Sequence, residues 1–91
     1  MFDFTEKVVM VTGSIGNLGS VVARAFQSSG AKLALVDRGE DRLKKAFPDL
    51  VGSQDYLLVN CADLMDENEV EISVTEAYQH FERIDVLVNT V

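Results

Sequence analysis

Four short apolar runs alternate with longer segments of helical character, and this alternation limits the fold more than any other feature of the sequence. The runs occupy residues 8–11, 33–36, 56–59 and 84–88. The first run is β-branched and uninterrupted, as is typical of a strand that is buried on both faces of a parallel sheet, whereas the fourth run contains Asp85. The sequence therefore predicts four buried strands within 91 residues.

The segments between the runs carry apolar side chains at the spacing of amphipathic helices. In the first segment, which is expected to stop at Gly30, the predicted inward face consists of Leu18, Val21, Val22, Ala25 and Phe26. The second segment predicts a short helix that breaks at Pro48. Its inward residues are Leu43, Ala46 and Phe47.

The third helical segment opens with Asp66 and, three positions later, Glu69, a pattern that resembles a capping box. Its predicted inward face consists of Val70, Val74, Ala77, Tyr78 and Phe81. The resulting order βαβαβαβ predicts a parallel sheet joined by right-handed crossovers. We expect one α/β domain over residues 1–91, with about four strands in the order 3-2-1-4 and flanking helices.

A glycine-rich stretch lies between the first strand and the first helix, where a Rossmann-type fold binds the pyrophosphate of a dinucleotide. Gly13 permits a tight turn, Gly16 lets the backbone approach the phosphates, and Gly19 lets the helix pack closely on the strand. The backbone N–H groups that follow point at the anion from the positive end of the helix dipole. A merely flexible turn is the alternative, but the flanking strand, helix and downstream acid favour cofactor binding. The expected contacts are Gly13, Ile15, Gly16, Asn17, Leu18 and Gly19.

Asp37 stands at the end of the second strand, near the offset at which an acid binds the adenosine ribose. Its carboxylate would accept a hydrogen bond from a free 2′-hydroxyl and repel a 2′-phosphate, which favours NAD over NADP. Arg38 would offset part of that repulsion. The alternative is that Asp37 is a solvated residue that caps the short helix.

Two further candidates follow later strands. Asp63, with Leu64, comes after the third strand, near the expected adenine ring, although Asp63 is equally consistent with an acid at a helix start. Asn89 ends the fourth strand at the crevice where ligands bind in open α/β sheets. His80 and Cys61 are expected to be structural, because no second metal ligand or paired cysteine accompanies them, and we expect no metal site.

The net charge and the length of the apolar runs limit the kinds of partner that the chain is expected to bind. The net charge is −7 and the basic residues form no stripe, so a nucleic acid is not an expected partner. No apolar run approaches 18 residues, and the first residues lack the features of a signal peptide. We expect no membrane partner and a cytoplasmic location.

Four features together resemble the short-chain dehydrogenase/reductase family: residues 12–19, Asp37, Asp63 with Leu64, and residues 85–89. The resemblance spans nearly the whole chain. It implies an NAD(P)-dependent oxidoreductase whose glycine loop binds pyrophosphate, whose acid after the second strand binds ribose, and whose acid after the third strand lies at adenine. The full-length parent would transfer a hydride between NAD(H) and a small alcohol or carbonyl substrate.

The sequence departs from the family pattern in three ways. Its glycines follow TGxxGxxG rather than the more frequent TGxxxGxG, which leaves the subfamily open. Asn89 is followed by Thr90 and Val91 instead of Asn-Ala-Gly, so only Asn89 is carried over. The family's Tyr-x-x-x-Lys pair is absent, and no residue is expected to be catalytic. We therefore expect an inactive amino-terminal fragment.

A second hypothesis belongs to a different class. The chain would be a non-catalytic dinucleotide-binding or interaction module that docks another chain through its fourth strand. Under the fragment hypothesis, we predict that the chain alone self-associates through that strand, because the apolar edge formed by residues 86–88 presents unpaired backbone groups.

Overall fold

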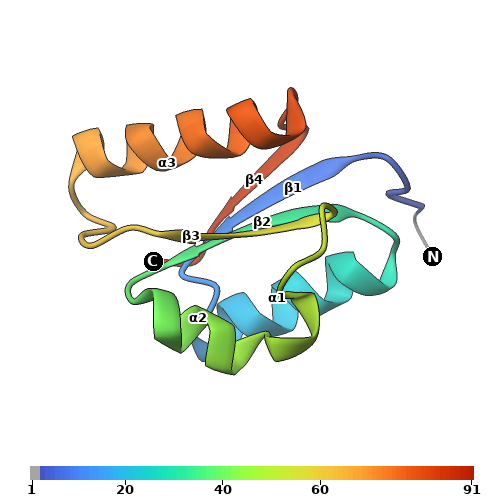
Figure 1. Ribbon diagram of the computed structural model, residues 1–91, viewed down its shortest axis with the longest axis horizontal. Helices are drawn as coiled ribbons and strands as arrows, with labels where there is room; N and C mark the ends of the chain where they lie inside the picture. The colour runs from blue at the N-terminus through green and yellow to red at the C-terminus, as the bar shows by residue number, and fades with distance from the viewer. Residues whose placement is uncertain (1–2) are drawn as a thin grey trace.

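The computed structural model describes residues 3–91 as a parallel sheet with helices on both faces (Figure 1). The strands are β1 (Val8–Thr12), β2 (Lys32–Asp37), β3 (Tyr56–Asn60) and β4 (Val86–Asn89). The helices are α1 (Asn17–Ser28), α2 (Glu40–Ala46) and α3 (Glu67–Phe81), with a short 3₁₀ turn at Pro48–Leu50. Among the described residues, no helix is long and apolar enough to cross a membrane.

The strand order is β3-β2-β1-β4 and every neighbouring pair is parallel, which confirms the predicted topology. Because side chains alternate along a strand, each central strand contributes to two cores. Val9 and Val11 pack in the core that contains Ala23 of α1, whereas Met10 packs with Ala77 of α3. Figure 1 shows α1 and α2 below the sheet and α3 above it.

Helix α1 uses the predicted face only in part, since Val22 and Phe26 pack against the core as predicted. Val21 is 67% exposed, and Leu18 and Ala25 are also exposed. The side that packs on the sheet also carries Gly19 and Ala23, which are buried and were not part of the predicted apolar face. The reason is steric, because the smallest side chains of the helix face the strands and allow the two backbones to approach closely.

Helix α3 begins at the predicted cap, and its predicted inward face packs on the sheet except at Tyr78. The Asp66 side chain caps the helix by accepting hydrogen bonds from the Asn68 and Glu69 N–H groups. Tyr78, predicted to face inward, is 57% exposed. It lies one residue beyond buried Ala77 and is therefore rotated away from the inward stripe, where Ser73 is buried instead.

Strand β4 begins at Val86, two residues later than predicted, because the preceding residues make the junction with β1. Glu82 ends α3 in the left-handed region, with φ 64°. The Asp85 carboxylate then accepts hydrogen bonds from the Val8 N–H at 2.8 Å and from the Arg83 guanidinium. The Arg83 guanidinium, helped by the Val8 N–H, lowers the pKa of Asp85 to about 2.

Strand β4 is an edge of the sheet. Its Leu87 lies in register with Met10, on the face that α3 covers, yet 56% of Leu87 is exposed. Val86 and Val88 pack partly against the opposite core. The strand therefore presents an apolar side chain beside an unpaired row of backbone groups.

Candidate functional site

The turns that follow β1, β2 and β3 lie at one end of the sheet, together with the carboxyl end of β4 (Figure 1). The predicted cofactor-binding residues lie in these turns, at these strand ends or in the first turn of α1. In open α/β sheets, ligands bind in the crevice outside the carboxyl ends of the strands. The fold thus brings together candidates that are up to 76 residues apart.

The turn after β1 is held by the neighbouring strand. The N–H groups of Gly13 and Ser14 both donate to the Val36 carbonyl, at 2.9 and 3.2 Å. The buried Ser14 hydroxyl donates to the same oxygen at 3.2 Å. Gly13 has φ +79°, a conformation that side chains rarely adopt, so the turn requires a glycine here as the sequence predicted.

Gly19 allows the first turn of α1 to touch the Gly13 peptide. A Cβ atom placed on Gly19 would lie 2.0 Å from the Gly13 carbonyl oxygen, a distance at which atoms overlap. The expected close packing at Gly19 is therefore present. It joins the helix to the turn rather than to the middle of the strand.

The first turn of α1 contains no acidic residue of its own. The N-cap of this helix is Gly16, which makes no side-chain hydrogen bond. Helix α3, in contrast, has Asp66 as its cap and two acids in its first turn. The positive end of the α1 dipole, at Asn17 and Leu18, thus meets no carboxylate of its own helix.

Asp37 is tied to the glycine-rich turn. One carboxylate oxygen accepts a hydrogen bond from the Ile15 N–H at 2.8 Å, and the other accepts from the Arg38 N–H at 2.7 Å. The N-cap of α2 is Gly39, which makes no side-chain cap. The alternative in which Asp37 caps the short helix is therefore wrong.

A hollow of about 310 Å³ opens beside Asp37. Its lining consists of Asp37, Arg38, Asp63, Leu64, Met65 and Val91. Four of these residues are predicted site residues, drawn from the ends of two different strands. Sequence reasoning missed Met65 and Val91, although Met65 follows Leu64 directly.

Asp63 shapes the turn between β3 and α3. Its carboxylate accepts a hydrogen bond from the Met65 N–H at 2.9 Å, and its carbonyl accepts from the Asp66 N–H. The helix-start role falls to Asp66 instead. Cys61 is buried beside the sheet with its Sγ 3.6 Å from the Asp63 carbonyl, in agreement with its predicted structural role.

Asn89 connects the ends of β1 and β4. Its Oδ1 accepts hydrogen bonds from the Thr12 hydroxyl at 2.9 Å and from the Val91 N–H at 3.1 Å. The Thr90 hydroxyl donates to the Thr12 carbonyl at 2.8 Å. Thr12 and Thr90 were not among the predicted site residues, and the only local signal for Thr90 is that it follows Asn89.

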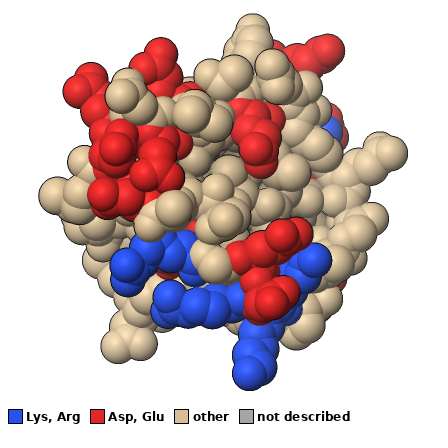
Figure 2. Space-filling model, turned by 60° about the vertical axis from the view of Figure 1, so that its left-hand side comes forward, with Lys and Arg blue, Asp and Glu red and all other residues tan. Residues whose placement is uncertain are grey.

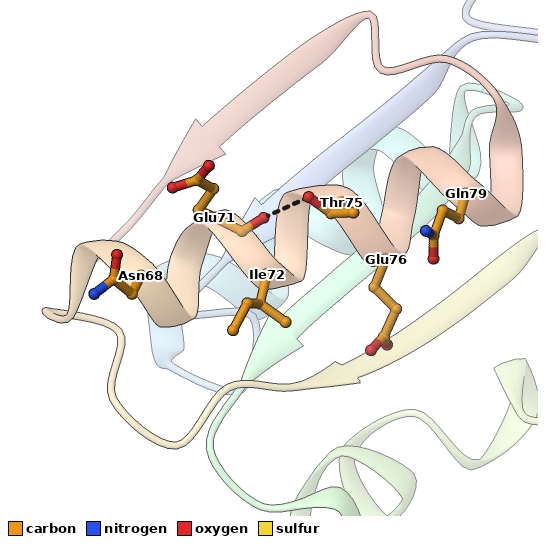
Figure 3. Close-up of a pocket in the computed structure, with 6 residues that line it drawn as sticks. All are labelled: Asn68, Glu71, Ile72, Thr75, Glu76 and Gln79. Atoms are coloured by element: carbon orange, nitrogen blue, oxygen red, sulfur yellow. Dashed lines mark hydrogen bonds between the residues drawn. The ribbon is translucent and has the colours of Figure 1, made fainter.

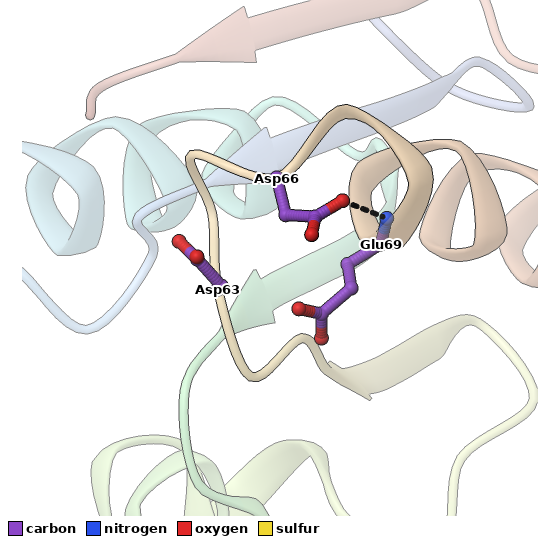
Figure 4. A group of neighbouring side chains, drawn as sticks. All are labelled: Asp63, Asp66 and Glu69. Atoms are coloured by element: carbon purple, nitrogen blue, oxygen red, sulfur yellow. Dashed lines mark hydrogen bonds between the residues drawn. The ribbon is translucent and has the colours of Figure 1, made fainter.

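Asp63, Asp66 and Glu69 form an acidic cluster at the start of α3 (Figure 4). One carboxylate oxygen from each lies within 4.8 Å of the others. Asp63 and Asp66 already accept backbone hydrogen bonds, and both are exposed. The cluster is accounted for by turn and helix capping, and the absence of a metal site stays an expectation.

Basic and acidic residues gather in different parts of the surface (Figure 2). Arg38, Arg42, Lys44 and Lys45 lie within eight residues of chain, whereas the segment from Asp63 to Glu82 holds seven acids and no Lys or Arg. Lys44 pairs with Glu40 at 3.3 Å. The basic group lies on and just before α2, next to the glycine-rich turn.

Two other regions hold no predicted cofactor-binding residue. A shallow hollow of about 380 Å³ runs along the outward face of α3, where Figure 3 shows Ile72 among the residues that line it. His80 lies at the other end of that helix, with Nε2 2.9 Å from the Gln54 carbonyl and its ring against Phe81. These contacts agree with the structural role predicted for His80.

The sequence model of the short chain dehydrogenase family matches residues 7–91. The chain belongs to this family. Among curated proteins, a dehydrogenase/reductase of CLA biosynthesis from Lactiplantibacillus plantarum is 36% identical over 89 residues, which cover 98% of this chain and 31% of that protein. The resemblance found in the sequence is thereby confirmed.

Solved structures of other short-chain dehydrogenases have the same fold. A glucose/ribitol dehydrogenase-type member from Brucella melitensis superposes with a TM-score of 0.85 at 28% identity, covering 94% of this chain and 36% of that one. A 3-ketoacyl-(acyl-carrier-protein) reductase from Brucella melitensis, complexed with NADH, gives 0.80 at 27% identity, covering 93% and 34%. This chain spans about a third of the length of these family members.

Proposed function

We propose that this chain binds NAD at the carboxyl ends of its strands, as the dinucleotide-binding part of a short-chain dehydrogenase. The observation that carries the proposal is the Asp37 carboxylate, which is joined to the Ile15 N–H at 2.8 Å and opens on the hollow beside Asp63 and Leu64. This hydrogen bond joins the acid that we propose to bind ribose to the turn that we propose to bind the pyrophosphate.

The turn after β1 suits the pyrophosphate. The α1 amino terminus has no capping side chain and no acid in its first turn, so the partial positive charge of the helix is available to an anion. Gly13, Gly16 and Gly19 carry no side chains, so the turn is compact and its backbone can approach a phosphate closely. These features fit a phosphate group on steric and electrostatic grounds.

Asp37 suits an unmodified ribose. Its carboxylate has lone pairs beyond those used by the Ile15 and Arg38 N–H groups, so it can also accept hydrogen bonds from ribose hydroxyls. A 2′-phosphate would bring a second negative charge against it. We therefore propose NAD as the preferred cofactor, with Arg38 offsetting part of the repulsion of NADP.

The hollow beyond Asp37 is suited to adenine. Leu64 and Met65 supply apolar surface, and Asp63 supplies oxygen acceptors at the rim. We propose that the adenine ring lies against Leu64, with Asp63 at its edge. Asn89 sits at the other side of the crevice, where it holds β4 in place through Thr12.

The activity of the whole enzyme follows as part of the same proposal. Bound NAD supplies the hydride-accepting ring, and the substrate is a small alcohol or carbonyl compound. The residues of this chain bind and orient the cofactor. The family's Tyr-x-x-x-Lys pair does not occur in this sequence, so we propose no catalytic residue here.

The proposal is tested by calorimetric titration of the 91-residue chain with NAD, NADP and adenosine diphosphate ribose. We expect NAD and adenosine diphosphate ribose to bind with similar affinity, because the proposed contacts are all with the adenosine and pyrophosphate parts, and NADP to bind more weakly. A chain that stays folded but binds none of the three would overturn the proposal.

One observation favours a second function, a non-catalytic docking module. The β4 edge carries Leu87, which is 56% exposed beside unpaired backbone groups. A module of this kind would bind another chain along β4. Such a module would still bind its partner chain after Asp37→Ala has weakened cofactor binding. A chain that only binds a cofactor would bind no partner along β4.

A further inference from the structure

Thr90 joins the end of β4 to the glycine-rich turn. Its hydroxyl lies 2.8 Å from the Thr12 carbonyl oxygen and 3.2 Å from the Gly13 carbonyl oxygen, and its N–H donates to Thr12 at 3.1 Å. The side chain is partly buried. One hydroxyl thus contacts two successive peptides where β1 becomes the turn.

The Gly13 carbonyl is confined from three directions. The Gly16 N–H donates to it at 3.1 Å, the Thr90 hydroxyl lies 3.2 Å away, and the Gly19 backbone packs so closely that a Cβ atom there would overlap the oxygen. Gly13 itself has φ +79° and could adopt other conformations at little cost. The neighbours of Gly13, and not its own preference, therefore fix the orientation of its peptide.

We propose that Thr90 is a positioning residue for the cofactor, whose hydroxyl holds the Gly13 peptide so that the glycine-rich turn keeps the shape that receives the pyrophosphate. The proposal rests on the proposed function. A carbonyl oxygen turned toward the phosphates would repel them, and the Thr90 contact keeps the Gly13 oxygen directed toward β4. Thr90 touches the turn and need not touch the cofactor.

The hydroxyl, rather than the bulk of the side chain, is the important part. A Cβ atom on Gly13 would lie 2.6 Å from the Thr90 oxygen, so this oxygen already fills the space beside the turn. Valine would fill nearly the same volume but could donate no hydrogen bond to either carbonyl. With valine at position 90, the Thr12 carbonyl would still accept the hydrogen bond from the backbone N–H of residue 90. The Gly13 carbonyl would lose its hydrogen bond from the residue that follows β4.

The test compares three variants of the 91-residue chain with the wild type by calorimetric titration with NAD and with adenosine. Thr90→Val removes the hydroxyl, and Thr90→Ser keeps it. Thr75→Val is the matched control, because the Thr75 hydroxyl also donates to a backbone carbonyl, that of Glu71 at 3.0 Å, on exposed α3. Urea unfolding of each variant measures stability separately.

We expect Thr90→Val to weaken NAD about tenfold, the effect of one lost hydrogen bond. Adenosine, which has no phosphate, should bind it as it binds the wild type. Thr90→Ser and Thr75→Val should bind NAD within about twofold of the wild type. In the amide spectrum of Thr90→Val, the Gly13 and Gly16 resonances should shift while the β3 resonances do not.

Two results would overturn the inference. One is a Thr90→Val chain that binds NAD as tightly as the wild type, and the other is a Thr90→Ser chain that loses as much affinity as Thr90→Val. If Thr90→Val does not fold, Thr90→Ala takes its place with the same expected loss. Failure of the wild type itself to bind NAD would count against the proposed function instead, which keeps the two failures distinguishable.

Discussion

The Asp37 carboxylate accepts a hydrogen bond from the Ile15 N–H at 2.8 Å and so fastens the end of β2 to the turn after β1. The same carboxylate is the proposed ribose acceptor. A single side chain thus has two roles, in the shape of the turn and in the choice of cofactor, and substitutions can separate them.

We predict that Asp37→Ala weakens NAD binding by about tenfold or more, since hydrogen bonds to a charged group are worth about 1.5–3 kcal/mol. NADP binding should fall less, because the repulsion of its 2′-phosphate disappears at the same time. Calorimetric titration with both nucleotides measures the ratio of the NAD and NADP affinities. Asp55→Ala, at the opposite end of β3, is the control for the loss of one negative charge. An unchanged ratio would assign Asp37 to the turn alone.

We predict that Gly19→Ala destabilises the chain. Alanine normally stabilises a helix interior relative to glycine, by about 1 kcal/mol. Here its Cβ would lie 2.0 Å from the Gly13 carbonyl oxygen, and overpacking of this kind costs about 1–3 kcal/mol. Urea unfolding should therefore show a lower free energy of unfolding. Ser28→Ala in the same helix is the control and should change stability little; a stabilised Gly19→Ala would contradict the close contact.

We predict an acid-dependent contribution from Asp85. Its pKa is lowered to about 2 in the folded chain, against about 3.9 in an unfolded one. The ionised form therefore stabilises the fold above pH 4, and this contribution is lost as the pH falls from about 4 to about 2. Both Asp85→Asn and Arg83→Gln should be less stable than the wild type near neutral pH. Thermal unfolding should show that this difference in stability shrinks as the pH falls toward 2. A difference that stays constant with pH would contradict the ion pair.

We predict that the 91-residue chain self-associates through β4. Leu87→Ser should reduce the oligomer fraction in sedimentation experiments, because it removes the exposed apolar side chain of the edge. Ile72→Ser, on the outward face of α3 and 64% exposed, is the matched control. Added salt should increase association, since it screens repulsion between chains of net charge −7. Equal effects of the two substitutions would remove β4 from the interface.

The features that sequence predicted best are local ones. The Asp66 cap bonds to residues two and three positions away, and each of the four strands overlaps one of the apolar runs. Apolar spacing identified Val22 and Phe26 as inward residues of α1 but missed Gly19 and Ala23, which are buried because their small size lets the helix approach the sheet. Thr90 could not be found either, since its carbonyl partners lie 77 and 78 residues away.

The pairing of β1 with β4 has a consequence for how the chain reaches its fold. Val8 and Asp85 are 77 residues apart, and β4 is the last strand of the described chain to leave the ribosome. Contacts this distant in sequence form late and slowly, because closing a long loop costs entropy before any contact repays it. During synthesis β1 can pair with β2 once Asp37 has emerged, but its other edge stays open until Asn89 has emerged. The strand that carries the glycine-rich turn is therefore exposed on one side until Asn89 has emerged, and chaperone binding before that point would be expected along β1.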